Sequence, residues 1–205
     1  MDKIDFKKQF KELYGAKPKP VIVDVPVLNF AMVDGEGDPN TAPAYPQAIE
    51  ALYAISYTIK FMLKKTGEFP DYSVPPLEGL WWMGGEDMFD FEAKHNWKWT
   101  AMIMQPEFVT KKIFNDGLKI AKEKKELPAL WGMRLENWKE GKAAQVLHVG
   151  PYSAEQPTIA TLHEFIKASG YVLEGKHHEI YLSDPRKTAP EKLKTIIRQP
   201  IGNKI

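Results

Sequence analysis

Cysteine is absent from the 205-residue chain. Its absence excludes disulfide bridges, thiolate metal sites and cysteine nucleophiles. No run of apolar residues approaches the roughly 20 needed for a membrane-spanning helix, and the amphipathic N-terminal segment lacks the uninterrupted apolar core of a signal peptide. These absences lead us to expect a cytoplasmic protein that makes no membrane contact.

The chain also has almost no net charge, because 28 Lys and Arg residues against 27 Asp and Glu residues give +1. Such a balance provides no electrostatic attraction to nucleic acid or to an anionic membrane. Gly35-Glu36-Gly37 is not followed by the glycines and lysine of a phosphate loop, and the five histidines lack the spacing of a helical metal site. We therefore expect no cofactor, no metal and no nucleic-acid partner.

Aromatic residues, by contrast, are abundant: the chain has six Trp, eight Tyr and ten Phe, together with eight Met. Trp is large and carries an N–H group that needs a partner, so it often lies at partly hydrated sites. The aromatic residues either fill the core or line a pocket, and the clustering of the Trp residues favours a pocket. The side chains that we expect to contact a flat ligand are Trp82, Trp99, Trp131 and Met133.

Hydrophobic periodicity predicts the elements of the first half. A helix is expected over residues 3–14, a strand over 20–34 interrupted at Pro26, a helix over 45–65, and strands over 77–84 and 97–105. The two later strands should form an antiparallel pair, joined by an acidic loop that contains Glu86, Asp87, Asp90 and Glu92. A Lys-rich helix over about 107–126 then leads to the second half.

The second half repeats this order of elements. Its expected elements are strands over 130–135 and 143–150 joined through 137–141, a helix over 154–169, a strand over 176–183, a short helix over 189–195 and a strand over 195–201. Strand–helix–strand–strand thus occurs twice, over about 20–105 and 130–202, although the halves share little sequence. We predict one α+β domain over 1–205 with duplicated β-α-β-β units, pseudo-twofold symmetry and antiparallel sheets that form a central ligand groove.

The strand near the C-terminus carries the most distinctive polar residues. Alternation places Glu179 and Tyr181 on one face and Ile180 on the other. On a solvated face they need no explanation, but in a cavity Glu179 is suited to bind a cation or to transfer a proton. Tyr181 either holds Glu179 in place or is a packed edge residue. Tyr152, at a strand-to-helix turn, either caps the groove or covers the core.

Several segments of the second half resemble the GyrI-like small-molecule-binding superfamily, which includes the effector domains of multidrug-sensing transcription activators. The matching segments are residues 141–152 (GKAAQVLHVGPY), 162–166, 169–171, 178–185 (HEIYLSDP) and 195–201 (TIIRQPI). The first half is similar mainly in its order of elements. The resemblance implies a ligand groove on the pseudo-twofold axis and a side chain of Glu179 that points into it.

A helix-turn-helix or coiled-coil segment ahead of the domain is not evident, so we do not expect a complete transcription activator. Residues 77–82 and 97–106 resemble a stand-alone branch of the superfamily, similar to cyclopropanoid cyclopropyl hydrolases. The first hypothesis is accordingly detoxification, in which Glu179, helped by Tyr181, directs water onto the strained ring of a DNA-alkylating xenobiotic. The second is a non-catalytic protein that binds, sequesters or senses hydrophobic aromatic or cationic compounds. The third hypothesis is a module that inhibits DNA gyrase. The sequence does not predict an oligomeric state.

Overall fold

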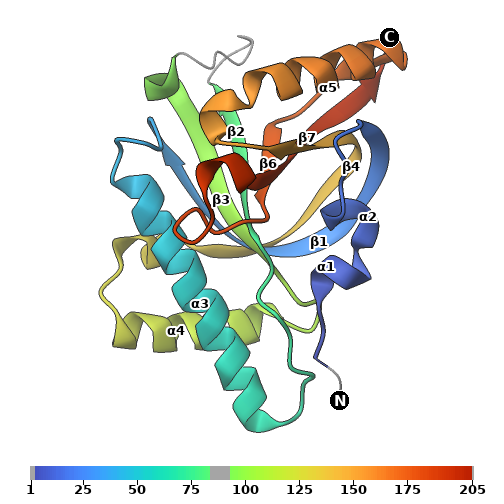
Figure 1. Ribbon diagram of the computed structural model, residues 1–205. Helices are drawn as coiled ribbons and strands as arrows, with labels where there is room; N and C mark the ends of the chain where they lie inside the picture. The colour runs from blue at the N-terminus through green and yellow to red at the C-terminus, as the bar shows by residue number, and fades with distance from the viewer. Residues whose placement is uncertain (1–2, 84–92, 205) are drawn as a thin grey trace. The chain divides into compact units, whose positions relative to one another are not determined.

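The computed structural model describes residues 3–83 and 93–204, which form two compact units (Figure 1). Unit 1 comprises Met1–Gln9 and Leu28–Trp138, and unit 2 comprises Phe10–Val27 and Lys139–Ile205. Two 16-residue strands, β1 (Val21–Glu36) and β4 (Arg134–Val149), contribute residues to both units.

Unit 1 is built from antiparallel strands and two long helices. Its further elements are α1 (Phe6–Gln9), α3 (Ala44–Thr66), β2 (Leu77–Met83), η1 (Lys94–Asn96), β3 (Trp97–Gln105), α4 (Lys111–Lys124) and η2 (Pro128–Trp131). Strand β3 pairs with β1 on one side, from Asn29 opposite Gln105 to Glu36 opposite Lys98, and with β2 on the other.

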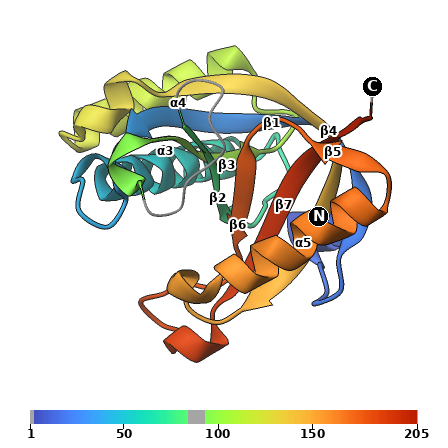
Figure 2. The ribbon, with the colours of Figure 1, turned by 90° about the horizontal axis from the view of Figure 1, so that it is seen from above.

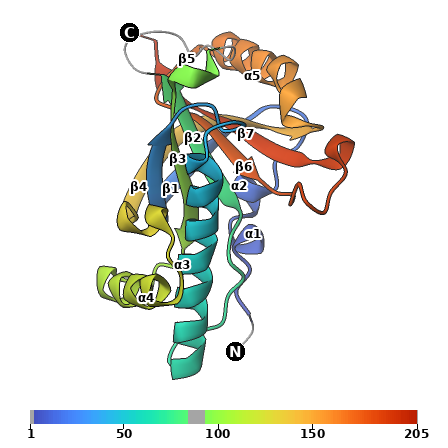
Figure 3. The ribbon, with the colours of Figure 1, turned by 90° about the vertical axis from the view of Figure 1, so that its left-hand side faces the viewer.

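Helix α3 covers one face of these strands and runs along them in Figure 3. The ring of Tyr45 lies 5.2 Å from that of Trp81 and 5.1 Å from that of Trp99. Farther along the helix, the Ser56 hydroxyl accepts a hydrogen bond of 3.1 Å from the Gln105 amide. Apolar side chains at helical spacing, which include Leu52, Ile55, Ile59 and Leu63, are buried on this side.

Unit 2 has its own antiparallel strands and one long helix. Its further elements are α2 (Lys11–Tyr14), η3 (Tyr152–Ala154), α5 (Gln156–Ala168), β5 (Tyr171–Leu173), β6 (His177–Tyr181), η4 (Pro190–Lys192) and β7 (Lys194–Asn203). Strand β7 pairs with β4, β5 and β6, and every pairing is antiparallel. Figure 2 shows α5 lying across β7.

The strand register shows which face of unit 2 is covered by α5. Thr195 on β7 lies opposite Tyr181 on β6 and opposite His148 on β4, so these three side chains share a face. The Nδ1 atom of His148 is 2.9 Å from the hydroxyl of Thr158 on α5. Tyr181 and its neighbours two residues away on β6 therefore lie on the helix-covered face.

The predicted α+β class with antiparallel sheets is confirmed. Strand–helix–strand–strand occurs as β1-α3-β2-β3 and again as β4-α5-β6-β7, with the three-residue strand β5 as an addition that the sequence did not predict. The helix expected over 45–65 is α3, and it ends at Gly67, whose φ of 71° is the left-handed conformation of a helix C-cap.

Two predictions for the N-terminal part were wrong. Residues 3–14 form two four-residue helices rather than one, because Phe10 leaves the helical region with φ −105° and ψ 53°. Strand β1 continues through Pro26 without interruption. Its ladder with β3 begins only at Asn29, so the missing N–H of Pro26 removes no hydrogen bond from that ladder.

The predicted boundaries around the middle of the chain also differ. Residues 128–131 form the 3-10 helix η2, with Pro128 at its start, and β4 then runs unbroken over the stretch 137–141 that was expected to be a connection. Helix α4 begins only at Lys111, where the Thr110 side chain accepts from the Ile113 amide. The predicted acidic loop, 86–92, lies outside the described residues.

Among the described residues, no helix combines the length and the apolar character needed to cross a bilayer.

Candidate functional site

The β6 strand places three polar side chains on the face that α5 covers. His177, Glu179 and Tyr181 alternate with His178 and Ile180, which point to the opposite face. The prediction that Glu179 and Tyr181 share a face of one strand is therefore confirmed. The side chain of Glu179 is 14% exposed and that of His177 is 5% exposed, so this carboxyl group is largely removed from water.

Two neighbours on the same strand hold the Glu179 carboxyl group. The Tyr181 hydroxyl donates a hydrogen bond of 2.7 Å to Glu179 Oε2, and His177 Nε2 lies 3.1 Å from Oε1. When the imidazole carries its proton on Nε2, both carboxylate oxygens accept a hydrogen bond. The plane of the carboxyl group is then fixed.

Glu155, which immediately precedes α5, is the second carboxyl group of the site. Its side chain makes no capping hydrogen bond to the helix, and the residue is 5% exposed. Burial and the adjacent negative charge of Glu179 raise the pKa of Glu155 to about 9, against the opposing effect of the Thr195 hydroxyl. At neutral pH Glu155 therefore holds a proton, and we call Glu155 and Glu179 the acid pair.

Two buried polar atoms at the acid pair and beside it have no hydrogen-bond partner among the described residues. They are Glu155 Oε1 and His163 Nε2, whereas the Thr195 hydroxyl acts on Glu155. Burial and the neighbouring His177 lower the pKa of His163, which lies on α5, so it is neutral at neutral pH. Buried polar groups are normally satisfied, and a group of unsatisfied ones in one place is typical of a functional site.

The predicted residue Tyr152 lies beside this group. It begins η3, just ahead of Glu155, and is 40% exposed. Its ring meets that of Tyr181 edge to face, with centroids 5.7 Å apart. The structure thus brings Tyr152, Tyr181 and Glu179 together and adds Glu155, which sequence reasoning missed; ligand binding by Tyr152 stays a prediction.

The predicted tryptophans Trp82 and Trp99 lie in unit 1, on opposite faces of the paired strands β2 and β3. Trp99 is opposite Trp81, and Trp82 is opposite Lys98. Trp99 is 1% exposed and packs under α3, where Gly35 leaves room for its ring: an added Cβ at Gly35 would lie 2.2 Å from the ring. The two residues therefore cannot line the same face of a ligand site, and ligand binding by either stays a prediction.

Trp131 and Met133 are also in unit 1, but neither lies on a strand, contrary to our expectation. Trp131 ends η2 and is 79% exposed, with the Lys122 ammonium 3.9 Å from its ring centre. It borders an open hollow of about 540 Å³ along α4. Met133 is buried beside a smaller hollow of about 190 Å³. Their role in ligand binding likewise stays a prediction.

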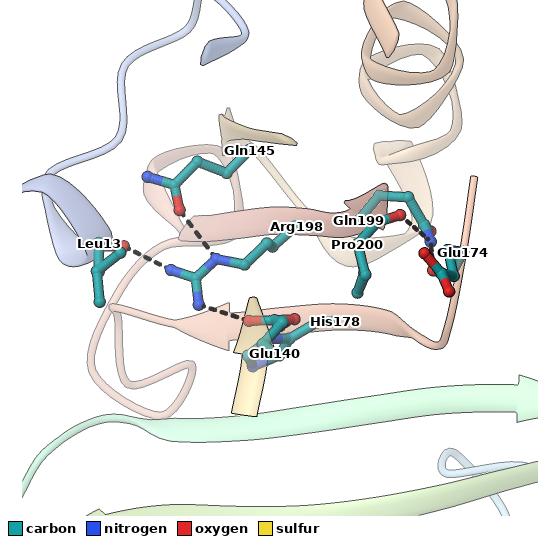
Figure 4. A network of polar contacts seen from close by, with 8 residues as sticks. All are labelled: Leu13, Glu140, Gln145, Glu174, His178, Arg198, Gln199 and Pro200. Carbon is teal, nitrogen blue, oxygen red and sulfur yellow. Dashed lines mark hydrogen bonds and ion pairs between the residues drawn. The ribbon is translucent and has the colours of Figure 1, made fainter. Parts of the chain in front are cut away.

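The opposite face of β6 carries a closed network of charged side chains (Figure 4). The side chains of His178 and Glu140 are 0% exposed and lie 2.8 Å apart, and Arg198 Nη1 lies 3.1 Å from the same Glu140 carboxyl group. Arg198 also donates to Gln145 Oε1 at 2.9 Å and to the carbonyl of Leu13 at 2.9 Å.

The charges of this network compensate one another. Burial alone would raise the pKa of Glu140, but the adjacent His178 and Arg198 outweigh that effect, and the pKa lies below its usual range. Glu140 is therefore ionised, and its charge is matched. We call Glu140, His178, Arg198 and Gln145 the charged network; it joins α2, β4, β6 and β7 within unit 2.

No group of three or more His, Asp or Glu side chains has the geometry of a metal site within 3–83 and 93–204. The acid pair and its neighbours offer a protonated carboxyl group, a second carboxyl group held by hydrogen bonds and a phenol that orients it.

Comparison with solved structures found several relatives of nearly the same length. A conserved protein from Listeria innocua is 43% identical, with a TM-score of 0.91 over 98% of this chain and 100% of its own. A hydrolase from Listeria innocua is 42% identical, with a TM-score of 0.88 over the same shares. The EcmrR C-terminal domain shares the fold at 11% identity, with a TM-score of 0.54 over 91% of this chain and 98% of that domain.

A search of curated proteins gave no match. The sequence model of one protein family, the GyrI-like small molecule binding domain, however, matches residues 18–201, nearly the whole chain. Together with the extended similarity to the Listeria innocua proteins, this match places the chain in the family of GyrI-like small molecule binding domains.

Proposed function

We propose that this protein binds hydrophobic aromatic xenobiotics beside the acid pair and hydrolyses the strained ring of cyclopropanoid DNA-alkylating compounds. The observation that carries the proposal is the acid pair itself: two carboxyl groups largely removed from water, of which Glu155 holds a proton at neutral pH while Tyr181 and His177 contact the other. Such a pair provides an acid and a base side by side. The 42% identity to a hydrolase over 98% of this chain supports hydrolytic chemistry.

The proposed reaction opens a cyclopropane ring that is conjugated to a carbonyl group. Water attacks a ring carbon and passes its proton to Glu179. The ring C–C bond breaks, its electron pair moves into the conjugated system, and the carbonyl oxygen takes the proton of Glu155. The products are an alcohol and a phenol or enol, and the proton now on Glu179 returns to Glu155. Water is the only co-reactant, and no oxidant or reductant is needed.

In this proposal Tyr181 and Tyr152 have separate tasks. Tyr181 orients the general base, Glu179, through its 2.7 Å hydrogen bond. Tyr152, exposed at the edge of the site, offers its ring to a flat ligand. Because strain relief lowers the intrinsic barrier, acid and base catalysis of about 10²–10⁴-fold is a sufficient contribution from the protein.

The test is to incubate the pure protein with a cyclopropanoid compound and to follow the loss of its conjugated absorbance. We expect Glu179→Gln and Glu155→Gln each to reduce the rate by about 10²–10⁴-fold. Glu164→Gln, which changes an exposed carboxylate on α5, is the matched control and should leave the rate unchanged. Equal rates for the wild type and both acid-pair variants would overturn the catalytic assignment.

Binding without catalysis is the second candidate, favoured by the charge of the site. With Glu155 protonated, the acid pair carries a single negative charge beside the rings of Tyr152 and Tyr181. A lipophilic cation gains from both the charge and the ring faces. Titration calorimetry with a rhodamine-like cation distinguishes the candidates: tight binding that is lost in Glu179→Gln, with no product formed from the cyclopropanoid compound, supports this one.

A further inference from the structure

The outer face of α3 carries a row of stacked aromatic side chains in unit 1. The rings of Tyr53 and Tyr57 are 6.3 Å apart at an interplanar angle of 25°, and those of Tyr57 and Phe61 are 6.1 Å apart at 22°. Tyr57 is 45% exposed and Phe61 is 58% exposed. Large aromatic side chains that adjoin one another on a surface are typical of protein interfaces. We call Glu50, Tyr53, Tyr57, Phe61 and Lys64 the α3 stripe.

The α3 stripe is symmetric about its central residue. Tyr53 and Phe61 are each four residues from Tyr57, and Glu50 and Lys64 are each seven residues from it. At 3.6 residues per turn, offsets of four and seven remain on one side of a helix. An antiparallel copy of α3, turned about a twofold axis at Tyr57, therefore meets Tyr53 with Phe61 and meets Glu50 with Lys64.

The charges at the two ends of the α3 stripe are complementary under that twofold operation. The side chains of Glu50 and Lys64 are 55% and 60% exposed. Each makes an ion pair at the surface, with Lys125 at 3.1 Å and with Asp71 at 3.4 Å respectively. Exposed pairs of this kind contribute little to stability, so they exchange partners readily. The small side chains of Ala54 and Thr58 beside Tyr57 also leave room for a second helix.

We infer that the α3 stripe is a self-association surface at which α3 packs antiparallel against α3 of a second copy of this chain. A twofold interface requires one patch to be complementary to itself, and the stripe meets this requirement in both its apolar and its charged positions. A different partner would not require this symmetry. Because one helix pair makes a small interface, we expect dissociation in the micromolar range.

The first test is sedimentation equilibrium of the full chain. The wild type should dimerise, and Tyr57→Lys, which brings two ammonium groups together on the axis, should raise the dissociation constant at least about 100-fold. Val172→Lys makes the same kind of change at an exposed apolar residue of β5 and is the matched control. A wild type that is monomeric at about 200 µM, or a Tyr57→Lys variant that remains dimeric, would overturn the inference.

The second test uses exchanged charges. Glu50→Lys and Lys64→Glu should each weaken the dimer about tenfold, because like charges then meet at both ends of the stripe. An equal mixture of the two variants should form heterodimers, in which both charge pairs are restored. If the mixture associates no better than either variant alone, the antiparallel register is wrong.

The third test uses the absence of cysteine from the natural chain. In Tyr57→Cys the new thiols lie on the twofold axis, so mild oxidation should link two copies at low protein concentration. Lys112→Cys, at an exposed position of α4, is the control and should stay uncrosslinked. Equal crosslinking of the two variants would contradict the α3 interface. The circular dichroism spectrum of each variant confirms that it is folded.

Discussion

The two faces of β6 show how neighbouring residues on one strand take opposite roles. On one face His178 belongs to the charged network, in which donors and acceptors are paired and Glu140 is ionised. On the other, Glu179 belongs to the acid pair, where buried polar atoms have no partner among the described residues and Glu155 holds a proton. Compensated charge stabilises the arrangement of strands, whereas uncompensated charge leaves interactions for a ligand.

The largest effect is expected from breaking the charged network. Glu140→Gln leaves the Arg198 guanidinium buried without its negative partner, and we expect a loss of about 3–5 kcal/mol in the free energy of unfolding. All six Trp residues lie in unit 1, so Trp fluorescence does not report on the unfolding of unit 2. Urea denaturation should therefore be followed by circular dichroism. A loss below about 1 kcal/mol would show that the network contributes no more than a surface pair.

On the acid-pair face the same kind of change should affect activity more than stability. Tyr181→Phe removes the 2.7 Å hydrogen bond to Glu179 and keeps the ring that packs against Tyr152. A hydrogen bond to a charged group contributes about 1.5–3 kcal/mol, so we expect the turnover rate to fall about tenfold or more. Steady-state kinetics should show this fall in kcat, and an unchanged kcat would remove the orienting role of Tyr181.

The third prediction concerns pH. The pKa of Glu155 is about 9 in the folded chain and near its ordinary value in the unfolded chain, so the folded state binds more protons between about pH 4.5 and 9. Stability should therefore fall as pH rises through this window, by at most about 1.4 kcal/mol per pH unit. Denaturation at pH 6, 7 and 8 should give a shallower slope for Glu155→Gln. Parallel slopes would contradict a buried, protonated Glu155.

The smallest effect is expected at Thr195. Its buried hydroxyl interacts with the carboxyl group of Glu155, and Val has nearly the same shape. Because this hydrogen bond favours the ionised form of Glu155, which is neutral at pH 7, Thr195→Val should lower the free energy of unfolding by less than about 1 kcal/mol. Because this hydroxyl lowers the pKa of Glu155, its removal should also move the alkaline limit of activity to higher pH. A loss of stability well above about 1 kcal/mol, or an unchanged alkaline limit, would contradict this weak interaction with Glu155.

The acid pair shows which site residues the sequence predicts and which it does not. Glu179 and Tyr181 were found because they are two residues apart, and the strand period alone places them together. Glu155 was missed because its approach to Glu179 depends on where α5 packs. At the start of a helix a Glu usually needs no further explanation, since it interacts favourably with the helix dipole. No local pattern distinguishes this Glu from an exposed one.

The tryptophans illustrate a second limit. Opposite faces for Trp81 and Trp82 follow from alternation, but the register that aligns Trp99 with Trp81 is set by the pairing of β2 with β3. Trp131 resembled a strand residue because Met133 and Leu135 follow it at alternate positions, yet Pro128 starts a 3-10 turn there. In both cases the sequence predicted the elements better than the pairing between them.

The proton on Glu155 has a consequence for how the folded molecule moves in an electric field. The formal charge of the chain is +1 at pH 7, and neutral Glu155 makes the folded protein about +2. Replacing Glu155 by Gln then exchanges one neutral side chain for another and leaves native electrophoretic mobility unchanged. The same replacement at an exposed Glu adds one unit of positive charge. Glu155 is acidic by residue type, yet in the folded protein it contributes no more charge than an amide side chain would.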